Sequence, residues 1–286
     1  MIYRLQFLLF LFLSVQAGSI LGQHDIDFYA DVMVSAQEPN HRYDAAVKFE
    51  NLLLQQLKVD STFAIVHSWK GAPVLYAPDS SFRMVSWSVP KRGSKSEGDT
   101  QIRGVFQKKG AAELQILSDK SEFERSNETS IFPPHRWLGA VYTEIYSVPD
   151  RDSLFLVYGR NPIDPYRMLH LLEVIDVTNS KIRFGHALWQ NKDSTLSTRK
   201  IFEVARGAQF QPKFHPEAKR IVVDHLRAVP YDQKGSVMVQ VPDGTYIFYD
   251  WEGEKWIYHD RLFSDDKDRV IRNPKKRKEA SKRDLF

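Results

Sequence analysis

The sequence predicts a mainly β protein: an antiparallel sheet sandwich or barrel-like fold with one N-terminal helix. Three observations support this fold class. Strand-length segments follow one another from residue 63 to residue 260. Within them β-branched and aromatic residues alternate with polar ones, as on a pleated, half-buried surface. Hydrophobic residues make up 42% of the chain and aromatic residues 13%, enough apolar side chain to build a sizeable core.

The first residues predict a secretory signal peptide over 1–22. Arg4 precedes an apolar run from Leu5 to Val15, and small residues follow that run. The run is too short to span a bilayer comfortably, so we expect its removal and no transmembrane segment afterwards. The chain has no cysteine, which excludes disulfides and thiolate metal sites. Export without cysteines indicates a bacterial protein that is periplasmic or secreted, and soluble.

One helix is expected near residues 44–58, because Asp44 can serve as its N-cap. Apolar residues then recur at helical spacing: Ala46, Phe49, Leu53 and Leu57. Such a stripe is typical of a helix that packs one face against the core.

Residues 23–271 are expected to form a single β-rich domain that contains this helix. The predicted strands lie near 63–68, 82–88, 101–107, 111–117, 138–147, 153–159, 168–177, 181–189, 199–205, 208–214, 219–226, 236–241, 245–251 and 255–260. The segment 168–177 is ambiguous, since its leucines also suit a helix. Its cluster of Val174, Ile175 and Val177 favours a strand.

The stretch 241–256, VPDGTYIFYDWEGEKW, predicts a turn, a strand, a tight hairpin and another strand. Pro242 fixes φ in the first turn, while Asp243 and Gly244 supply a side-chain cap and tolerance of positive φ. Similar Pro-Asp pairs at 78–79 and 149–150 leave a degenerate β-propeller as the alternative fold. They lie further apart than the roughly 40–50 residues of a propeller blade, so the sandwich or barrel is preferred.

The positive charge of the chain is concentrated in residues 272–286. Their seven Lys or Arg against Glu279 and Asp284 give a local charge of +5, whereas the whole chain carries +4. The rest of the chain is therefore close to neutral. We expect this basic tail to be disordered, with an anionic lipid surface as the other interpretation, and we expect no nucleic-acid partner because an exported chain rarely meets one.

Several short segments carry a family resemblance: Lys200–Glu203, Ile221–Leu226, Pro242–Gly244, Trp137–Tyr142 and Phe184–Gly185. With them the chain resembles a group of uncharacterised secreted β-rich proteins of Bacteroidota, over about Phe63 to Asn273. The resemblance implies export and one β-rich unit. It implies no reaction or ligand, because none is assigned to that group.

The sequence lacks the motifs of several enzyme classes: a Gly-rich phosphate loop, a nucleotide fingerprint, a zinc helix with paired histidines and a Gly-x-Ser-x-Gly elbow. We therefore expect no cofactor and no metal. The candidate catalytic residues are Glu203, Asp224 and His225, because a carboxylate and an imidazole can act as acid and base. Neighbours on a strand point to opposite faces, so structural roles are favoured for Asp224 and His225.

A candidate binding surface is predicted on the segment 138–147. Tyr142, Glu144 and Tyr146 alternate there, so they would share one face of a regular strand. An aromatic platform with a carboxylate suits sugar rings and other flat ligands. Buried aromatic packing is the commoner role of such tyrosines.

Two functional hypotheses follow. The preferred one is an exported, non-catalytic β-rich protein that binds or scaffolds at the bacterial envelope, with an envelope protein, a glycan or an anionic lipid surface as partner. The alternative is an extracytoplasmic hydrolase acting on glycan or peptide, with Glu144, Glu203, Asp224 or His225 as acid or base. The alternative requires at least two of these side chains to converge in one concave site.

Overall fold

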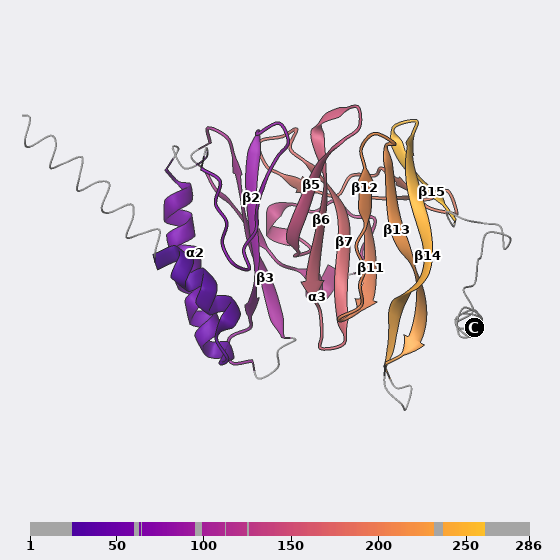
Figure 1. The fold of residues 1–286 in the computed structure, drawn as a ribbon. Coiled ribbons are helices and arrows are strands. Elements are labelled where there is room, and N and C mark those ends of the chain that lie inside the picture. The colour runs from indigo at the N-terminus through magenta and orange to yellow at the C-terminus, as the bar shows by residue number, and fades with distance from the viewer. Residues whose placement is uncertain are drawn as a thin grey trace, which may run out of the picture.

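The computed structural model describes residues 25–59, 63, 65–94, 99–111, 113–124, 126–231 and 237–260. A helical layer and three sheets are stacked one on the next, and the chain passes through them roughly in this order, except that β9 and β10 of the third sheet precede β11 of the second (Figure 1). The prediction of a mainly β sandwich is confirmed, and the sheets lie as open layers rather than as propeller blades. The predicted signal peptide (1–22) and basic tail (272–286) lie outside the described residues.

The helical layer is longer than predicted. Residues 25–35 are helical, and α2 runs from Pro39 to Leu57. Pro39 begins α2 because its fixed φ suits the first helical position, so Asp44 lies inside the helix and is not its N-cap. Among the described residues, no helix combines the length and the apolar character needed to cross a membrane.

The apolar stripe of α2 packs as predicted. Phe49, Leu53 and Leu57 are buried against the first sheet, where they meet Val85 and Trp87. The edge-to-face contact of Phe49 and Trp87, with ring centroids 5.5 Å apart, belongs to this core. Burial of the stripe therefore attaches the helix to the β layers.

The first sheet has the order β1-β2-β3-β4. Its strands are β1 (Val74–Tyr76), β2 (Phe82–Pro90), β3 (Thr100–Lys108) and β4 (Gln115–Ser118). One face packs on the helices and the other on the second sheet, so β2 is buried along almost its whole length. The short helices α3 (Ser121–Glu124) and η2 (Pro134–Arg136) follow before the chain enters the second sheet.

The second sheet has the order β11-β7-β6-β5, and β8 also pairs with β7. Its strands are β5 (Val141–Val148), β6 (Arg151–Pro162), β7 (Arg167–Asp176), β8 (Arg183–Phe184) and β11 (Arg199–Ala205). The ambiguous segment 168–177 is therefore a strand. Leu169 and Leu171 enter the core shared with the first sheet, whereas Leu172 and Val174 enter the core shared with the third. Burial on both faces explains why β7 lacks an alternating pattern.

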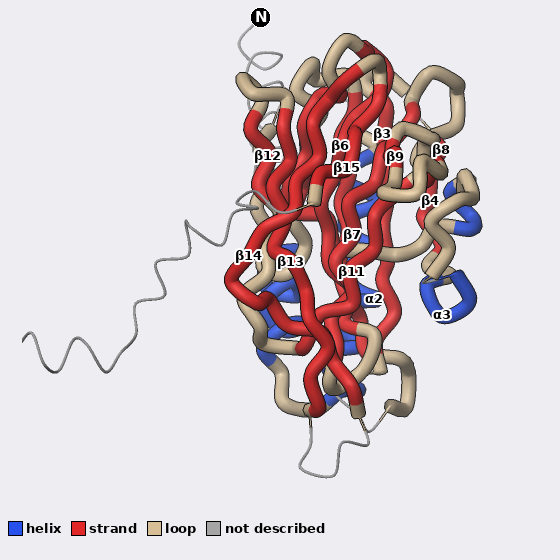
Figure 2. The backbone as a smooth tube through the Cα atoms, turned by 90° about the vertical axis from the view of Figure 1, so that its right-hand side faces the viewer, coloured by secondary structure: helices blue, strands red, loops and turns tan. Residues whose placement is uncertain are grey.

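The third sheet has the order β10-β9-β15-β14-β13-β12. Its strands are β9 (Trp189–Gln190), β10 (Leu196–Ser197), β12 (Lys213–His215), β13 (Arg220–Pro230), β14 (Met238–Glu252) and β15 (Lys255–His259). Trp189, Tyr249 and Trp256 lie in the core between the third and second sheets. Figure 2 shows β13 and β14 running together as one long ribbon.

The predicted turn at Pro242–Gly244 is wrong, because β14 continues through it. Asp224 pairs with Tyr246 and Leu226 with Pro242, so residues 243–245 of β14 stand opposite the single residue His225. Gly244 has a φ of +85° there, and Asp243 Oδ1 accepts a hydrogen bond from the Thr245 backbone N–H at 2.9 Å. The residues that favour a turn are present, but they form a β-bulge that bends one strand instead of ending it.

Other strand boundaries also differ from the predictions. Residues 65–68 form no strand, and 181–189 contains only β8 and the first residue of β9. Within 208–214 only the last two residues belong to a strand, and β1 was missed. In 181–189 and 208–214 the apolar residues are buried in irregular connections, so burial alone gave these segments a strand-like composition. In 65–68 the apolar residues Ile65 and Val66 are exposed, so their β-branched side chains were misleading.

A buried ion pair ties the second sheet to the loops around it. Arg199 and Glu173 are fully buried, with Nε 2.6 Å from Oε1. Arg199 also donates hydrogen bonds to the backbone carbonyls of Asn127 (2.8 Å) and Phe184 (3.0 Å). Gly185 makes room for this guanidinium: its φ is +96°, and a Cβ there would lie 2.5 Å from Arg199 Nη2.

Replacing Leu53 with Ala should lower the free energy of unfolding by about 2–5 kcal/mol, because the substitution leaves a cavity in the core between α2 and the first sheet. Urea denaturation measures the loss. The exposed Gln55 on the same helix is the control, and Gln55→Ala should change stability by no more than about 0.5 kcal/mol. Equal effects of the two substitutions would contradict the assignment of the buried face.

Candidate functional site

A cavity of about 620 Å³ is lined by the second sheet, by residues 207–211 of the connection that follows β11, and by β12, β13 and β14. Its side chains with polar groups are Arg160, His170, Gln209, Gln211, Lys213, Asp224 and Tyr246. The volume suits a small ligand or a few sugar rings.

His170 on β7 is a neutral imidazole in this cavity at neutral pH. Burial, reinforced by the nearby positive charge of Arg160, lowers the pKa of His170 to about 4. Its Nδ1 lies 2.7 Å from the Tyr158 hydroxyl, whose own pKa burial raises to about 12. Phe210 packs edge-on against the imidazole, with ring centroids 4.7 Å apart. These contacts hold the ring in place.

Two cations and one carboxylate complete the charged lining. Arg160 comes from β6 and Lys213 from β12, and neither forms an ion pair or a side-chain hydrogen bond with another described residue. Asp224 on β13 is half-buried, and burial raises its pKa although a backbone N–H of Gln211 and the charge of Lys213 oppose the shift. The two cations therefore outnumber the one carboxylate in the cavity lining.

Asp224 is the one predicted catalytic residue that lines this cavity. Glu203 lies elsewhere, because its carboxylate pairs with Arg167 at 3.0 Å on the face of β11 that points to the first sheet. Arg167 is also bound by Asp164 at 2.6 Å. Glu203 therefore belongs to a partly exposed ion-pair group.

His225 pairs with Asp243 across the bulge and not with Asp224. Its Nδ1 lies 2.7 Å from Asp243 Oδ2. Burial acts to raise the pKa of Asp243, but hydrogen bonds from Thr245 and the contact with His225 outweigh it and lower that pKa to about 2. Glu203, Asp224 and His225 thus occupy three separate environments, and the structure does not bring them together.

The predicted platform of Tyr142, Glu144 and Tyr146 is also wrong, because β5 contains a second bulge. Tyr142 pairs with Gly159, but Glu144 pairs with the adjacent residue Tyr158, so Thr143 is left over. The extra residue turns Tyr142 into one core and the other two side chains toward the opposite face.

Each of these side chains has a partner within the fold. The Tyr142 hydroxyl donates to Glu173 Oε2 at 2.6 Å and accepts from the Trp137 indole N–H at 2.9 Å. The Tyr146 hydroxyl donates to Glu144 Oε2 at 2.7 Å. Burial is the larger cause, and this contact the smaller one, that raises the pKa of Tyr146 to about 12. Tyr142 is structural, whereas Glu144 reaches the edge of the cavity through a 2.8 Å hydrogen bond from Gln211.

The sequence analysis missed Arg160, His170, Lys213 and Tyr246. They are separated along the chain and carry no motif, so only the pairing of the strands brings them to one cavity. The available signal was local: Gln209, Phe210 and Gln211 form a short polar and aromatic connection directly after an apolar strand.

Replacing Glu173 with Gln should cost about 3–5 kcal/mol in the free energy of unfolding, because it leaves the buried Arg199 without its counter-charge. Glu203→Gln is the matched control, since it breaks a Glu–Arg pair that is partly exposed and should cost no more than about 1 kcal/mol. Guanidinium denaturation compares them. Similar losses in both variants would show that burial does not govern these pairs.

The lowered pKa of His170 predicts a stability change in acid. Between pH 6.5 and 4 the unfolded chain binds a proton at this residue that the folded chain does not, so stability falls as the pH drops through this window. The loss from this residue should total about 3 kcal/mol and should be absent in His170→Gln. Ring resonances of His170 in NMR spectra should not titrate between pH 7 and 5.5, and a midpoint near pH 6.5 would refute the assignment.

No family model, no curated protein and no solved structure matches this chain. The resemblance to secreted proteins of Bacteroidota therefore stays a prediction.

Proposed function

We propose that this protein is an exported, non-catalytic binding protein of the bacterial envelope, and that its cavity holds an acidic glycan. The observation that carries the proposal is the pair of cations, Arg160 and Lys213, in a cavity of about 620 Å³. Neither forms an ion pair or a side-chain hydrogen bond with a described residue, although Asp224 lies in the same lining and feels the charge of Lys213. A cation that faces a cavity without a direct hydrogen bond to a protein carboxylate is positioned to bind a carboxylate or sulfate of a ligand.

The rest of the lining suits a sugar. Tyr246 is 39% exposed and lines the cavity, so aromatic surface is available to the apolar face of a ring. Gln209, Gln211 and Asp224 offer donors and acceptors for hydroxyl groups. An uncharged glycan would use these groups but would leave both cations unpaired, so an acidic one is preferred.

The arrangement favours binding over hydrolysis. Glycoside hydrolases commonly place two carboxyl groups on either side of the scissile bond. Asp224 is the single carboxylate in the cavity lining among the described residues. Glu144 lies at the edge, where Tyr146 and Gln211 already donate to its two oxygens, and Glu203 and His225 lie outside the lining. The hydrolase alternative rests on the raised pKa of Asp224, which suits a general acid, with His170 as the nearby base.

Calorimetry with the full chain tests the proposed ligand class. Uronic-acid oligosaccharides should bind, neutral oligosaccharides of equal length should bind at least tenfold more weakly, and added salt should reduce the difference. Arg160→Gln and Lys213→Gln should each weaken binding by about tenfold or more, because each removes a charged hydrogen bond. Lys181→Gln is the control, since Lys181 is exposed and does not line the cavity.

Two outcomes would contradict the proposal. Equal affinity for acidic and neutral glycans in all variants would remove the cavity as an anion site. Release of new reducing ends that depends on Asp224 would establish the hydrolase instead. Cell fractionation tests export separately, because a precursor that stays intact in the cytoplasm would refute it regardless of ligand.

A further inference from the structure

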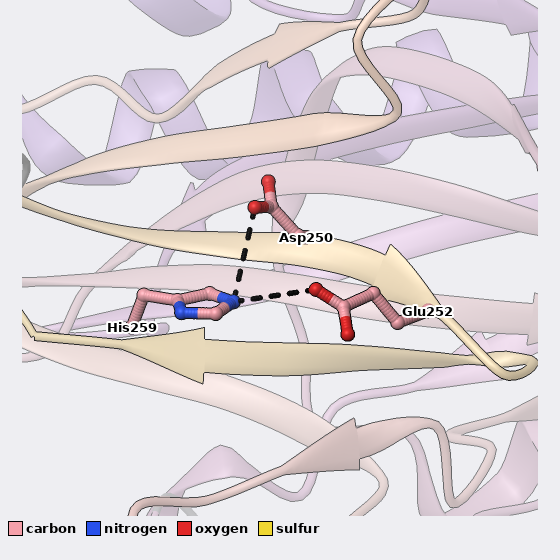
Figure 3. A group of neighbouring side chains, drawn as sticks. All are labelled: Asp250, Glu252 and His259. Atoms are coloured by element: carbon pink, nitrogen blue, oxygen red, sulfur yellow. Dashed lines mark ion pairs between the residues drawn. The ribbon is translucent and has the colours of Figure 1, made fainter.

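Three side chains on the outward face of the third sheet converge without touching (Figure 3). His259 Nε2 lies 3.8 Å from Asp250 Oδ2 and 3.7 Å from Glu252 Oε1. One ligand atom from each side chain falls within 4.8 Å of the other two. The sequence predicted no metal because it lacks cysteine and a zinc helix with paired histidines.

The hairpin of β14 and β15 brings the three residues together. Asp250 and Glu252 are two residues apart on β14, so they lie on the same face. A two-residue turn at 253–254 returns the chain, and His259 on β15 comes to that face. Trp256 on the other face is fully buried and holds the register, since a slip by one residue would expose it.

Stacking holds the imidazole of His259 in place, but its Nε2 has no hydrogen bond to a described residue. The ring stacks on Phe248, with ring centroids 4.7 Å apart and an angle of 10° between the planes. The Nε2 atom is buried. The distances to the two carboxylates exceed the roughly 3.2 Å limit of a good N–H···O bond. A cation between the three ligand atoms would satisfy all of them.

We infer that Asp250, Glu252 and His259 form a binding site for a divalent transition-metal ion, with Zn²⁺ as the best match. One imidazole nitrogen and two carboxylate oxygens are suitable zinc ligands, and a fourth position stays open to water or a ligand. Bonds of about 2.0–2.2 Å at a tetrahedral angle separate ligand atoms by roughly 3.3–3.5 Å. The separations of 3.8 and 3.7 Å from His259 Nε2 need to shorten by a few tenths of an ångström. The two carboxylate oxygens, within 4.8 Å of each other, need to move closer by more, which the 62% exposed side chain of Glu252 allows.

Arg220 is not one of the three ligands, but it holds the carboxylate of Asp250 in place. Its Nε lies 2.6 Å from Asp250 Oδ1 and its Nη2 lies 2.8 Å from Oδ2. The pair fixes the Asp250 carboxylate, and each oxygen keeps a second lone pair for a metal. With a neutral imidazole, Asp250, Glu252 and Arg220 together carry a charge of −1. This charge favours a divalent cation, although Arg220 makes the site weaker than one with two unpaired carboxylates.

Calorimetric titration of the full chain with Zn²⁺ tests the inference. Binding at this site should be lost, or weakened by at least about tenfold, in both His259→Gln and Glu252→Gln. The matched control is His215→Gln, because His215 is an exposed histidine on β12 of the same sheet. Zn²⁺ should also raise the melting temperature of the wild type and of the control more than that of the two site variants. Ca²⁺ and Mg²⁺ should not compete, since they prefer more oxygen ligands.

The rival interpretation is a cluster of ion pairs in which a protonated His259 bridges two carboxylates. In that case His259→Gln and Glu252→Gln would bind Zn²⁺ as the wild type does. Either this result or the absence of Zn²⁺ binding by the wild type would overturn the inference. Neither result bears on glycan binding, because none of the three residues lines the cavity.

Discussion

The second sheet is covered on both faces, and this constraint governs where polar chemistry can occur in the molecule. Burying an ion pair costs more desolvation energy than the attraction returns unless hydrogen bonds satisfy the remaining polar atoms. Arg199 and Glu173 meet that condition through carbonyls of Asn127 and Phe184 and through the hydroxyl of Tyr142. Because those partners come from three separate parts of the chain, the pair fixes the loop, the short strand β8 and the edge strand β5 around β7 and β11.

The same constraint places the cavity at one end of β6 and β7. Along the middle of these strands, apolar side chains from the neighbouring sheets fill the space on both faces. Arg160 and Met168 come from the ends of their strands that the β6–β7 hairpin joins, and residues 207–211 of the connection after β11 line the same cavity. There the packing is incomplete and charged side chains reach solvent. Glu173, in the middle of β7, is structural, whereas Arg160, near the end of β6, faces the cavity.

Much of the layered fold could be predicted from the sequence, because the spacing of apolar residues along a helix or strand indicates which of its faces is buried. The stripe of α2 and the β-branched pair Val174 and Ile175 of β7 were sufficient to identify a packed helix and a central strand. The convergence of side chains could not be predicted, since it depends on the register between strands far apart in sequence. His225 illustrates the difficulty: its neighbour in the chain is Asp224, but its partner is Asp243 on the opposite strand. The alternation of side chains along a strand predicted that Asp224 and His225 point to opposite faces. No feature of the neighbouring sequence predicted that Asp243 would be the partner of His225.

Two bulges account for the remaining differences and also shape the cavity. A regular strand would have placed Glu144 on the same face as Tyr142, but the extra residue Thr143 turns Glu144 toward Gln211 at the cavity edge. In β14 the residues 243–245 bend the ribbon directly after the pair of Asp224 and Tyr246, which both line the cavity. A bulge redirects the side chains beyond it without changing the sheet order. Strand pairing brings the lining residues together, and the two bulges set which side chains lie at its edge, which is why a sequence read as regular strands predicted the layers but not the site.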